Sequence, residues 1–242
     1  MNVWILCYFR TGSSFLAEML NATDLFDGEF GEKVQRATRI EIIERYKQIY
    51  EKGGRLIPQN HTQMCREHFE FFYNNRDKKF IESRLPGLKY ILLRRRNLVK
   101  SGISDYFSLV TKSSTLPTEK DKEKYLDIPI PFDEEMVLES YYRTMKSYYG
   151  WISYLQGSKY IEFEHEDLKR HPLMVIGSVL DYLGLKYDQE EVRLKIEKRK
   201  AEEIAAGRYS RMRPMPQRPE RLEYEERLRK ILEERGLPIE GR

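Results

Sequence analysis

Short apolar runs that alternate with helical patterns constrain the fold of this chain more than any other feature of its sequence. The clearest run covers residues 88–93, reads LKYILL and has the composition of a buried strand. A helical pattern follows each run, and this order of elements is typical of a parallel sheet with helices on both faces. The sequence therefore predicts an α/β fold with a mainly parallel sheet. The predicted strands are residues 3–9, 55–58, 88–93 and 159–163.

The helical patterns are clearest in the second half of the chain. Residues 133–155 carry apolar side chains at every third or fourth position, and Asp133 is a suitable N-cap. Ser13 and Ser14 are the expected N-cap residues of the first helix. Residues 112–131 are rich in Lys, Ser, Thr and Pro and are predicted to form a long surface loop. The other predicted helices are residues 38–52, 63–74, 97–110, 172–183, 188–206 and 219–235.

Length, charge and cysteine content exclude several classes of protein. The 242 residues are predicted to form one domain, 1–242, in which residues 188–242 are a C-terminal helical extension. The 43 Lys and Arg against 39 Asp and Glu give a net charge of +4, too small for a nucleic-acid-binding or membrane-surface protein. The 17 Tyr, 11 Phe and 2 Trp exclude a disordered chain. The two cysteines are too few for a disulfide framework or a zinc site and are expected to be buried free thiols.

The sequence shows no pattern of a membrane segment. No apolar run reaches the length of a membrane span, and the N-terminal run is too short for a signal peptide. If the chain is complete, it is expected to be cytoplasmic.

Basic, hydroxyl and imidazole side chains follow the predicted strands at their carboxyl ends. Residues 10–14, His61 and residues 94–104 each lie just past a predicted strand. Parallel α/β sheets bind their ligands outside the carboxyl ends of the strands. We therefore expect these three segments to meet at one edge of the sheet.

The first of these segments has the properties of an anion-binding loop. Gly12, Ser13 and Ser14 allow backbone N–H groups to approach an anion, and the helix that follows directs its positive end at the same point. Arg10 adds a positive charge. The loop is not a Walker motif, because Cys7 and Ser13 stand where that motif requires Gly and Lys.

Residues 8–16, YFRTGSSFL, resemble the 5′-phosphosulfate loop of sulfotransferases that use 3′-phosphoadenosine 5′-phosphosulfate (PAPS). In that family a Lys or Arg, a small residue, a Gly and two Ser or Thr follow the first strand. The RTGSS form is closer to the carbohydrate and trehalose-type branches than to the soluble phenol and steroid enzymes. The resemblance implies that the residues binding the 5′-phosphosulfate are Arg10, Thr11, Gly12, Ser13, Ser14 and Phe15.

A second resemblance concerns the 3′-phosphate of PAPS. Arg96 follows the strand at 88–93, and Ser104 comes eight residues later, which is the spacing of the Arg and Ser that contact this phosphate in the family. An Arg fork and a hydroxyl suit a phosphate monoester. Many members also close over the nucleotide with a late basic segment, and this resemblance implies that Arg208 and Arg211 lie near the 3′-phosphate.

A third resemblance covers residues 160–168 and 183–185, which are similar to the family's strand, Tyr-Glu-Asp-Leu and Leu-Gly-Leu segments. His165 stands in place of the tyrosine. The three matches follow the family's order along the chain and imply its P-loop-NTPase-like sulfotransferase fold.

The resemblance implies a reaction in which the sulfuryl group of PAPS moves by in-line displacement to a hydroxyl or amine of a carbohydrate or small molecule. The product nucleotide is adenosine 3′,5′-bisphosphate. Because a sulfuryl group carries less charge than a phosphoryl group, Arg10 and backbone N–H groups suffice to stabilise it, and no metal is expected.

The acceptor proton must pass to a base, for which the resemblance provides two candidates. Glu32 is the preferred one, because the carbohydrate and trehalose-type branches have a Glu at about this distance from the loop. His61 is the alternative, since it resembles the strand-end histidine of the phenol and steroid enzymes. The two residues are also compatible with a base and a group that orients it.

Other functions remain open at this stage. One is a P-loop-like nucleotide or small-molecule kinase, and another is a catalytically inactive relative that only binds nucleotide. The expected partner is a small-molecule or carbohydrate acceptor rather than a nucleic acid, and a homodimer is compatible with the sequence.

Overall fold

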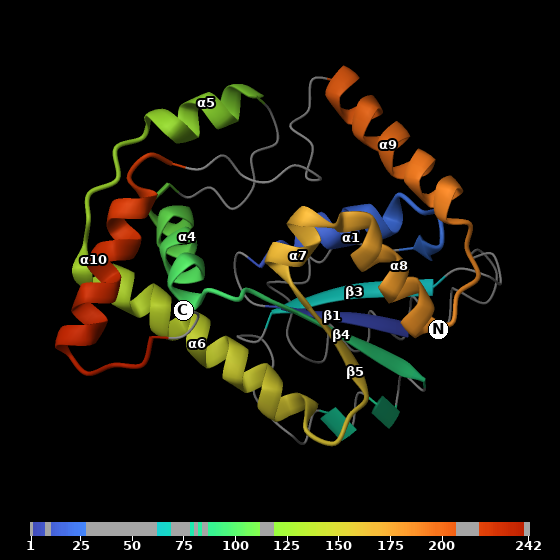
Figure 1. Cartoon of the computed structure of the whole chain (residues 1–242), viewed down its shortest axis with the longest axis horizontal. Helices are drawn as coiled ribbons and strands as arrows, with labels where there is room; N and C mark the ends of the chain where they lie inside the picture. The colour runs from blue at the N-terminus through green and yellow to red at the C-terminus, as the bar shows by residue number, and fades with distance from the viewer. Residues whose placement is uncertain are drawn as a thin grey trace.

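The computed structural model describes residues 2–7, 11–27, 62–68, 78–79, 82–83, 87–111, 119–206 and 218–239. Within these residues a five-stranded sheet has the order β2-β3-β1-β4-β5, and all neighbouring strands pair in parallel. The predicted parallel α/β sheet is confirmed (Figure 1). The strands are β1 (Asn2–Cys7), β2 (Phe26–Asp27), β3 (Thr62–His68), β4 (Leu88–Arg94) and β5 (Tyr160–Glu164).

The helices of the described residues agree closely with the periodic segments of the sequence. Five predicted helices are found with ends shifted by no more than two residues, and these are the ones at 97–110, 133–155, 172–183, 188–206 and 219–235. Asp133 caps the long helix as predicted, its side chain accepting from the Met136 N–H at 3.0 Å. The helices are α1 (Ser13–Asn21), α4 (Leu98–Thr111), α5 (Glu119–Asp127), α6 (Glu134–Leu155), α7 (His165–Arg170), α8 (Pro172–Leu183), α9 (Gln189–Ala205) and α10 (Arg221–Glu234).

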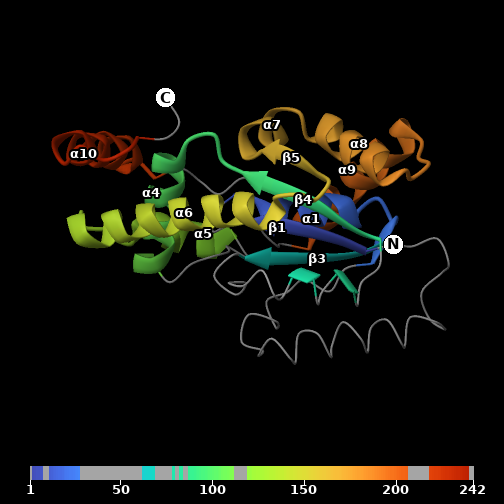
Figure 2. The same cartoon turned by 90° about the horizontal axis from the view of Figure 1, so that it is seen from below.

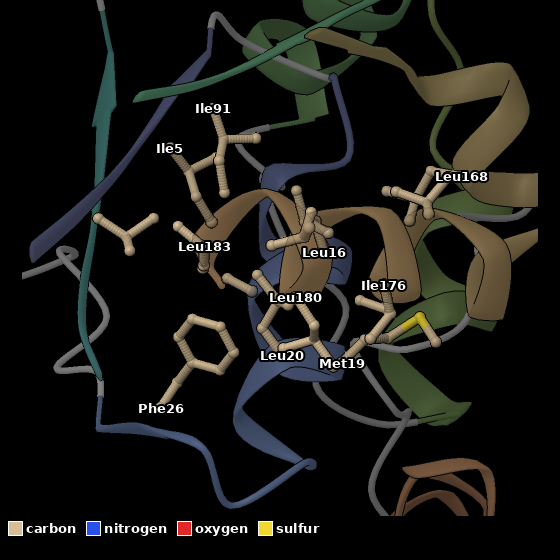
Figure 3. Packing of buried hydrophobic residues seen from close by; sticks show 14 of the residues in the cluster. Ile5, Leu16, Met19, Leu20, Phe26, Ile91, Leu168, Ile176, Leu180 and Leu183 are labelled. Atoms are coloured by element: carbon tan, nitrogen blue, oxygen red, sulfur yellow. The ribbon is translucent and has the colours of Figure 1, made fainter. Parts of the chain in front are cut away.

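The two faces of the sheet pack against different helices because side chains alternate along each strand. On one face Ile5 and Ile91 pack with α1 and α8, and Figure 3 shows these contacts from close by. On the other face Leu6 and Leu92 pack against Trp151 of α6. The sheet is therefore buried on both sides in its centre, as expected for parallel strands.

A second group of helices lies beyond the carboxyl ends of the strands. Figure 2 shows the arrowheads of β3 and β4 pointing to the side of the molecule on which α4 and α10 lie. Helices α4, α6 and α10 share a core of their own, to which α10 contributes Tyr224, Leu228 and Leu232. Helix α9 instead packs on the sheet side through Val192 and Ile196. The two helices of the predicted C-terminal extension thus pack at different ends of the molecule (Figure 1).

Two of the predicted elements are wrong. The helix predicted at 63–74 is strand β3 as far as His68, because pairing with β1 and β2 outweighs the weak periodicity of a polar segment. The surface loop predicted at 112–131 contains helix α5, whose Tyr125 is buried and whose carbonyl accepts from Arg218. The predicted helix at 38–52 and strand at 55–58 lie outside the described residues.

Candidate functional site

The loop between β1 and α1 leads from the sheet edge directly into a helix. Cys7 ends β1, is buried as predicted, and accepts a hydrogen bond from Trp151 Nε1 through its carbonyl at 2.6 Å. Gly12 lies at the N-cap position of α1 with a φ of 82°, in the left-handed region that favours glycine. Helix α6 therefore fixes the end of the strand from which the loop departs.

The start of α1 differs from the prediction that a serine would cap it. The helix begins at Ser13, and Gly12 before it provides no side-chain cap. The first-turn N–H groups of an α-helix have no partner within the helix, so they remain suited to an external acceptor. Thr11 and Ser13 are buried, whereas Phe15 packs partly against the core. Arg10 lies outside the described residues, as does the side chain of Ser14.

His165, the first residue of α7, packs directly against this loop at Gly12. A Cβ atom added to Gly12 would lie 2.4 Å from Nδ1 of His165 and 2.9 Å from its Cε1. Nδ1 is buried and has no hydrogen-bond partner within the part of the chain that the structure describes. Two features therefore require a glycine at position 12: its left-handed backbone conformation, and the His165 imidazole that occupies the space of a side chain.

The surroundings of His165 hold its ring in the neutral form. Burial, followed by the charge of Arg95, lowers the pKa of His165 from 6.5 to about 3, and Lys169 and Arg221 act in the same direction. A contact with the Thr11 backbone opposes this shift. The ring that packs against the loop is therefore uncharged at neutral pH.

Acid is expected to destabilise the protein through His165. The pKa of His165 is lower in the folded than in the unfolded state, so its stabilising contribution is present above pH 6.5 and is lost as the pH falls toward 3. Between pH 7 and pH 5 this loss amounts to about 2 kcal/mol. Urea unfolding at the two pH values should show that His165→Phe removes this part of the pH dependence, while His171→Phe, at an exposed histidine, keeps it. An unchanged pH dependence in His165→Phe would contradict the expectation.

The segment after β4 is attached to β5 and α7 by acidic side chains. Arg96 Nε donates to Oε2 of Glu164 at 2.6 Å, and the Arg96 backbone N–H donates to Oε2 of Glu166 at 3.0 Å. Arg94 forms a further ion pair with Glu164 at 2.8 Å. The Arg96 side chain is 51% exposed, so it is open to a ligand from the solvent side while it is held by Glu164.

Helix α4 begins at the same sheet edge. Asn97 accepts the Lys100 N–H on its side-chain oxygen at 2.9 Å and so caps the helix. Ser104 lies in the second turn and is buried. Arg96 and Ser104, predicted together from their spacing, thus belong to one strand–helix junction.

Two arginines that the sequence did not single out converge on the first turn of α4. Arg95 Nη1 and Arg221 Nη2 both donate to the Lys100 carbonyl, at 3.2 Å and 3.1 Å. Arg221 is the first residue of α10 and follows the Arg-rich stretch of the sequence, which is the only signal that pointed to it. Arg208 and Arg211, the predicted residues of that stretch, lie outside the described residues.

Strand β3 adds a histidine at the carboxyl edge. His68 is its last residue and is the Cα partner of Cys7, at the point where the anion-binding loop begins. Thr62 begins β3 at the opposite edge, about 20 Å of strand away. The predicted candidates Glu32 and His61 lie outside the described residues.

None of the helices in the described residues is long and apolar enough to cross a membrane. The described residues also contain no group of three or more His, Cys, Asp or Glu side chains that could hold a metal ion.

Comparison with solved structures gives similar folds at low sequence identity. A sulfotransferase from Alicyclobacillus acidocaldarius has a TM-score of 0.51 and 16% identity, with coverage of 87% of this chain and 93% of that chain. A mouse sulfotransferase complexed with PAP has a TM-score of 0.56 and 13% identity, with coverage of 96% and 82%. A sulfotransferase from Mycobacterium avium has a TM-score of 0.51 and 9% identity, with coverage of 100% and 78%. At these identities the similarity shows the fold.

Sequence comparison identifies the family. No curated protein is significantly similar to the chain in sequence. The family model described as the sulfotransferase domain matches residues 1–234, which include the loop after β1, the junction after β4 and the junction between β5 and α7. The chain therefore belongs to the sulfotransferase domain family.

Proposed function

We propose that this protein transfers a sulfuryl group from PAPS to a hydroxyl or amine of a small-molecule or carbohydrate acceptor. The observation that carries the proposal is the loop at Gly12, which opens α1 at the carboxyl edge of the sheet in a chain matched to the family over residues 1–234. The mouse sulfotransferase is complexed with PAP, which is adenosine 3′,5′-bisphosphate, and this supports the choice of nucleotide. The RTGSS sequence of the loop favours the carbohydrate or trehalose-type branch.

The nucleotide would bind across the edge formed by β1 and β4. Amides of residues 12–14 would bind the 5′-phosphosulfate together with Arg10. Arg96 and Ser104 would bind the 3′-phosphate, with Arg208 or Arg211 closing over it. The positive charges of Arg95 and Arg221 at the start of α4 favour an anion in the same place. The 3′-phosphate would share the Arg96 guanidinium with Glu164, which already accepts from it.

The chemical step needs a base and charge stabilisation. The acceptor oxygen or nitrogen attacks sulfur, the bond between sulfur and the bridging phosphate oxygen breaks, and adenosine 3′,5′-bisphosphate leaves with the electron pair. The acceptor proton passes to the base. His68 is a candidate for this role, because its register opposite Cys7 supports a place beside the phosphosulfate loop, and Glu32 and His61 are the candidates from the sequence.

Two measurements on the purified chain test the function. We expect it to bind adenosine 3′,5′-bisphosphate at micromolar concentrations and to transfer radiolabelled sulfate from PAPS to a member of a panel of sugars, phenols and amines. Mg²⁺-dependent binding of ATP in place of the bisphosphate would instead support a kinase. Tight bisphosphate binding without transfer to any acceptor would support an inactive relative. Failure to bind either PAPS or the bisphosphate would overturn the proposal.

A further inference from the structure

Three consecutive residues at the end of β5 contact both segments to which we assign the phosphates. Glu164 ends β5, and His165 and Glu166 begin α7; we call Glu164, His165 and Glu166 the β5–α7 junction. His165 contacts the loop after β1, and its two neighbours contact the segment after β4. The junction therefore connects two loops that are far apart in the sequence.

The contact with the first loop is steric. The His165 ring fills the space that a side chain at position 12 would take, with Nδ1 2.4 Å from an added Cβ. Any movement of this ring would therefore move the backbone at Gly12 or leave it unsupported. The ring is also uncharged at neutral pH, because burial, followed by the charges of Arg95, Lys169 and Arg221, lowers the pKa of His165. It supports the loop without competing for an anion.

The contact with the second segment is polar. Glu164 accepts from the Arg96 side chain, and Glu166 accepts from the Arg96 backbone N–H. Glu164 is also the register partner of Arg94 in the sheet, so the position of the junction along β4 is fixed. The Glu164 side chain is only 16% exposed, which limits its freedom to move. Both the backbone and the side chain of Arg96 thus depend on the junction.

We propose that the β5–α7 junction is a spacer that sets the distance between the 5′-phosphosulfate and 3′-phosphate sites, with His165 as its positioning residue. The inference rests on the proposed function, because it needs a ligand with two phosphate groups. A ligand that carries both groups gains from the second only when the two sites stand at the right separation, and errors of about 1 Å cost up to about 100-fold. The junction would therefore determine how much affinity the second phosphate group adds, rather than the affinity of either site for a single phosphate.

The test measures the gain directly. Dissociation constants are determined for adenosine 3′,5′-bisphosphate, adenosine 5′-monophosphate and adenosine 3′-monophosphate, and the ratio of the 5′-monophosphate value to the bisphosphate value defines the 3′-phosphate gain. We expect His165→Ala to lower this gain at least about tenfold while the affinity for the 3′-monophosphate changes by less than about threefold. His165→Phe, which keeps a flat uncharged ring, should retain the gain. His171→Ala, at an exposed histidine six positions later, is the matched control and should equal the wild type.

A second variant guards against loss of folding in His165→Ala. Glu166→Ala removes the acceptor of the Arg96 backbone N–H from a partly exposed position and is expected to lower the same gain. An equal loss of affinity for the 5′-monophosphate and the bisphosphate would mean that the junction supports only the first loop and would overturn the proposal. An unchanged gain in both variants would overturn it as well. Absence of bisphosphate binding by the wild type would instead contradict the proposed function itself.

Discussion

Gly12→Ala is expected to lower kcat/KM for PAPS by about 100-fold, because a displacement of about 1 Å in a positioned group can have this effect. Alanine at a φ of 82° is strained, and its Cβ would overlap the ring of His165 at 2.4 Å. The backbone must therefore shift at the point where the first-turn N–H groups of α1 are proposed to bind the sulfuryl donor. Steady-state kinetics with PAPS and titration with adenosine 3′,5′-bisphosphate measure both consequences.

Gly157→Ala is the matched control for this effect. Gly157 has a φ of 76°, nearly that of Gly12, but no atom lies within 4 Å of an added Cβ. It precedes β5 at the amino edge of the sheet, away from the proposed site. Its substitution should cost about 1–2 kcal/mol of stability and leave kcat/KM unchanged. Equal kinetic losses in the two variants would show that strain alone, rather than the position of the loop, lowers activity.

The elements that the sequence predicted well are those whose apolar residues form one regular pattern, either a helical stripe or an unbroken run. Helix α8 runs from Pro172 to Leu183, as its apolar stripe and the following Gly184 predicted. Strand β4 was equally clear because it is buried on both faces and reads as a continuous apolar run. In both cases the local pattern and the tertiary packing require the same residues.

Strand β3 shows where local patterns fail. Its sequence, TQMCREH, has no apolar alternation, and its place in the sheet is decided by β1 and β2 on its two sides. Missing this strand also left its last residue, His68, out of the predicted site residues. The predicted strand at 55–58 and His61 lie outside the described residues, so that prediction stays a prediction.

The residues of the candidate site also fall into those that the sequence predicted and those that it could not predict. The small residues at 12–14 were recognisable because a phosphate loop requires them wherever it occurs. The support of that loop by His165 and the approach of Arg221 to Lys100 join residues more than 100 positions apart, and no spacing rule predicts them. The sequence likewise could not predict the acidic partners of Arg96, because Glu164 reaches Arg96 only through the pairing of β4 with β5.

The position of His68 leads to the second large effect. We expect His68→Asn to lower kcat by about 10²–10⁴-fold, the usual contribution of a general base. Asparagine keeps a similar size and hydrogen-bonding capacity but cannot take the acceptor proton at neutral pH. The affinity for adenosine 3′,5′-bisphosphate should stay within about threefold of wild type, since a base acts on the acceptor rather than on the nucleotide. His171→Asn, at an exposed position at the start of α8, should keep wild-type turnover.

Glu32→Gln and His61→Asn separate the three candidates for the base. His68 follows from a register, Cys7 opposite His68, that brings the end of β3 beside the start of the phosphosulfate loop. Glu32 and His61 follow from resemblance alone. If Glu32→Gln or His61→Asn abolishes turnover with bisphosphate binding intact while His68→Asn remains active, His68 is not the base. If both His68→Asn and Glu32→Gln lower kcat and the double variant is no worse than either, the two residues act as one unit, one taking the proton and the other orienting it.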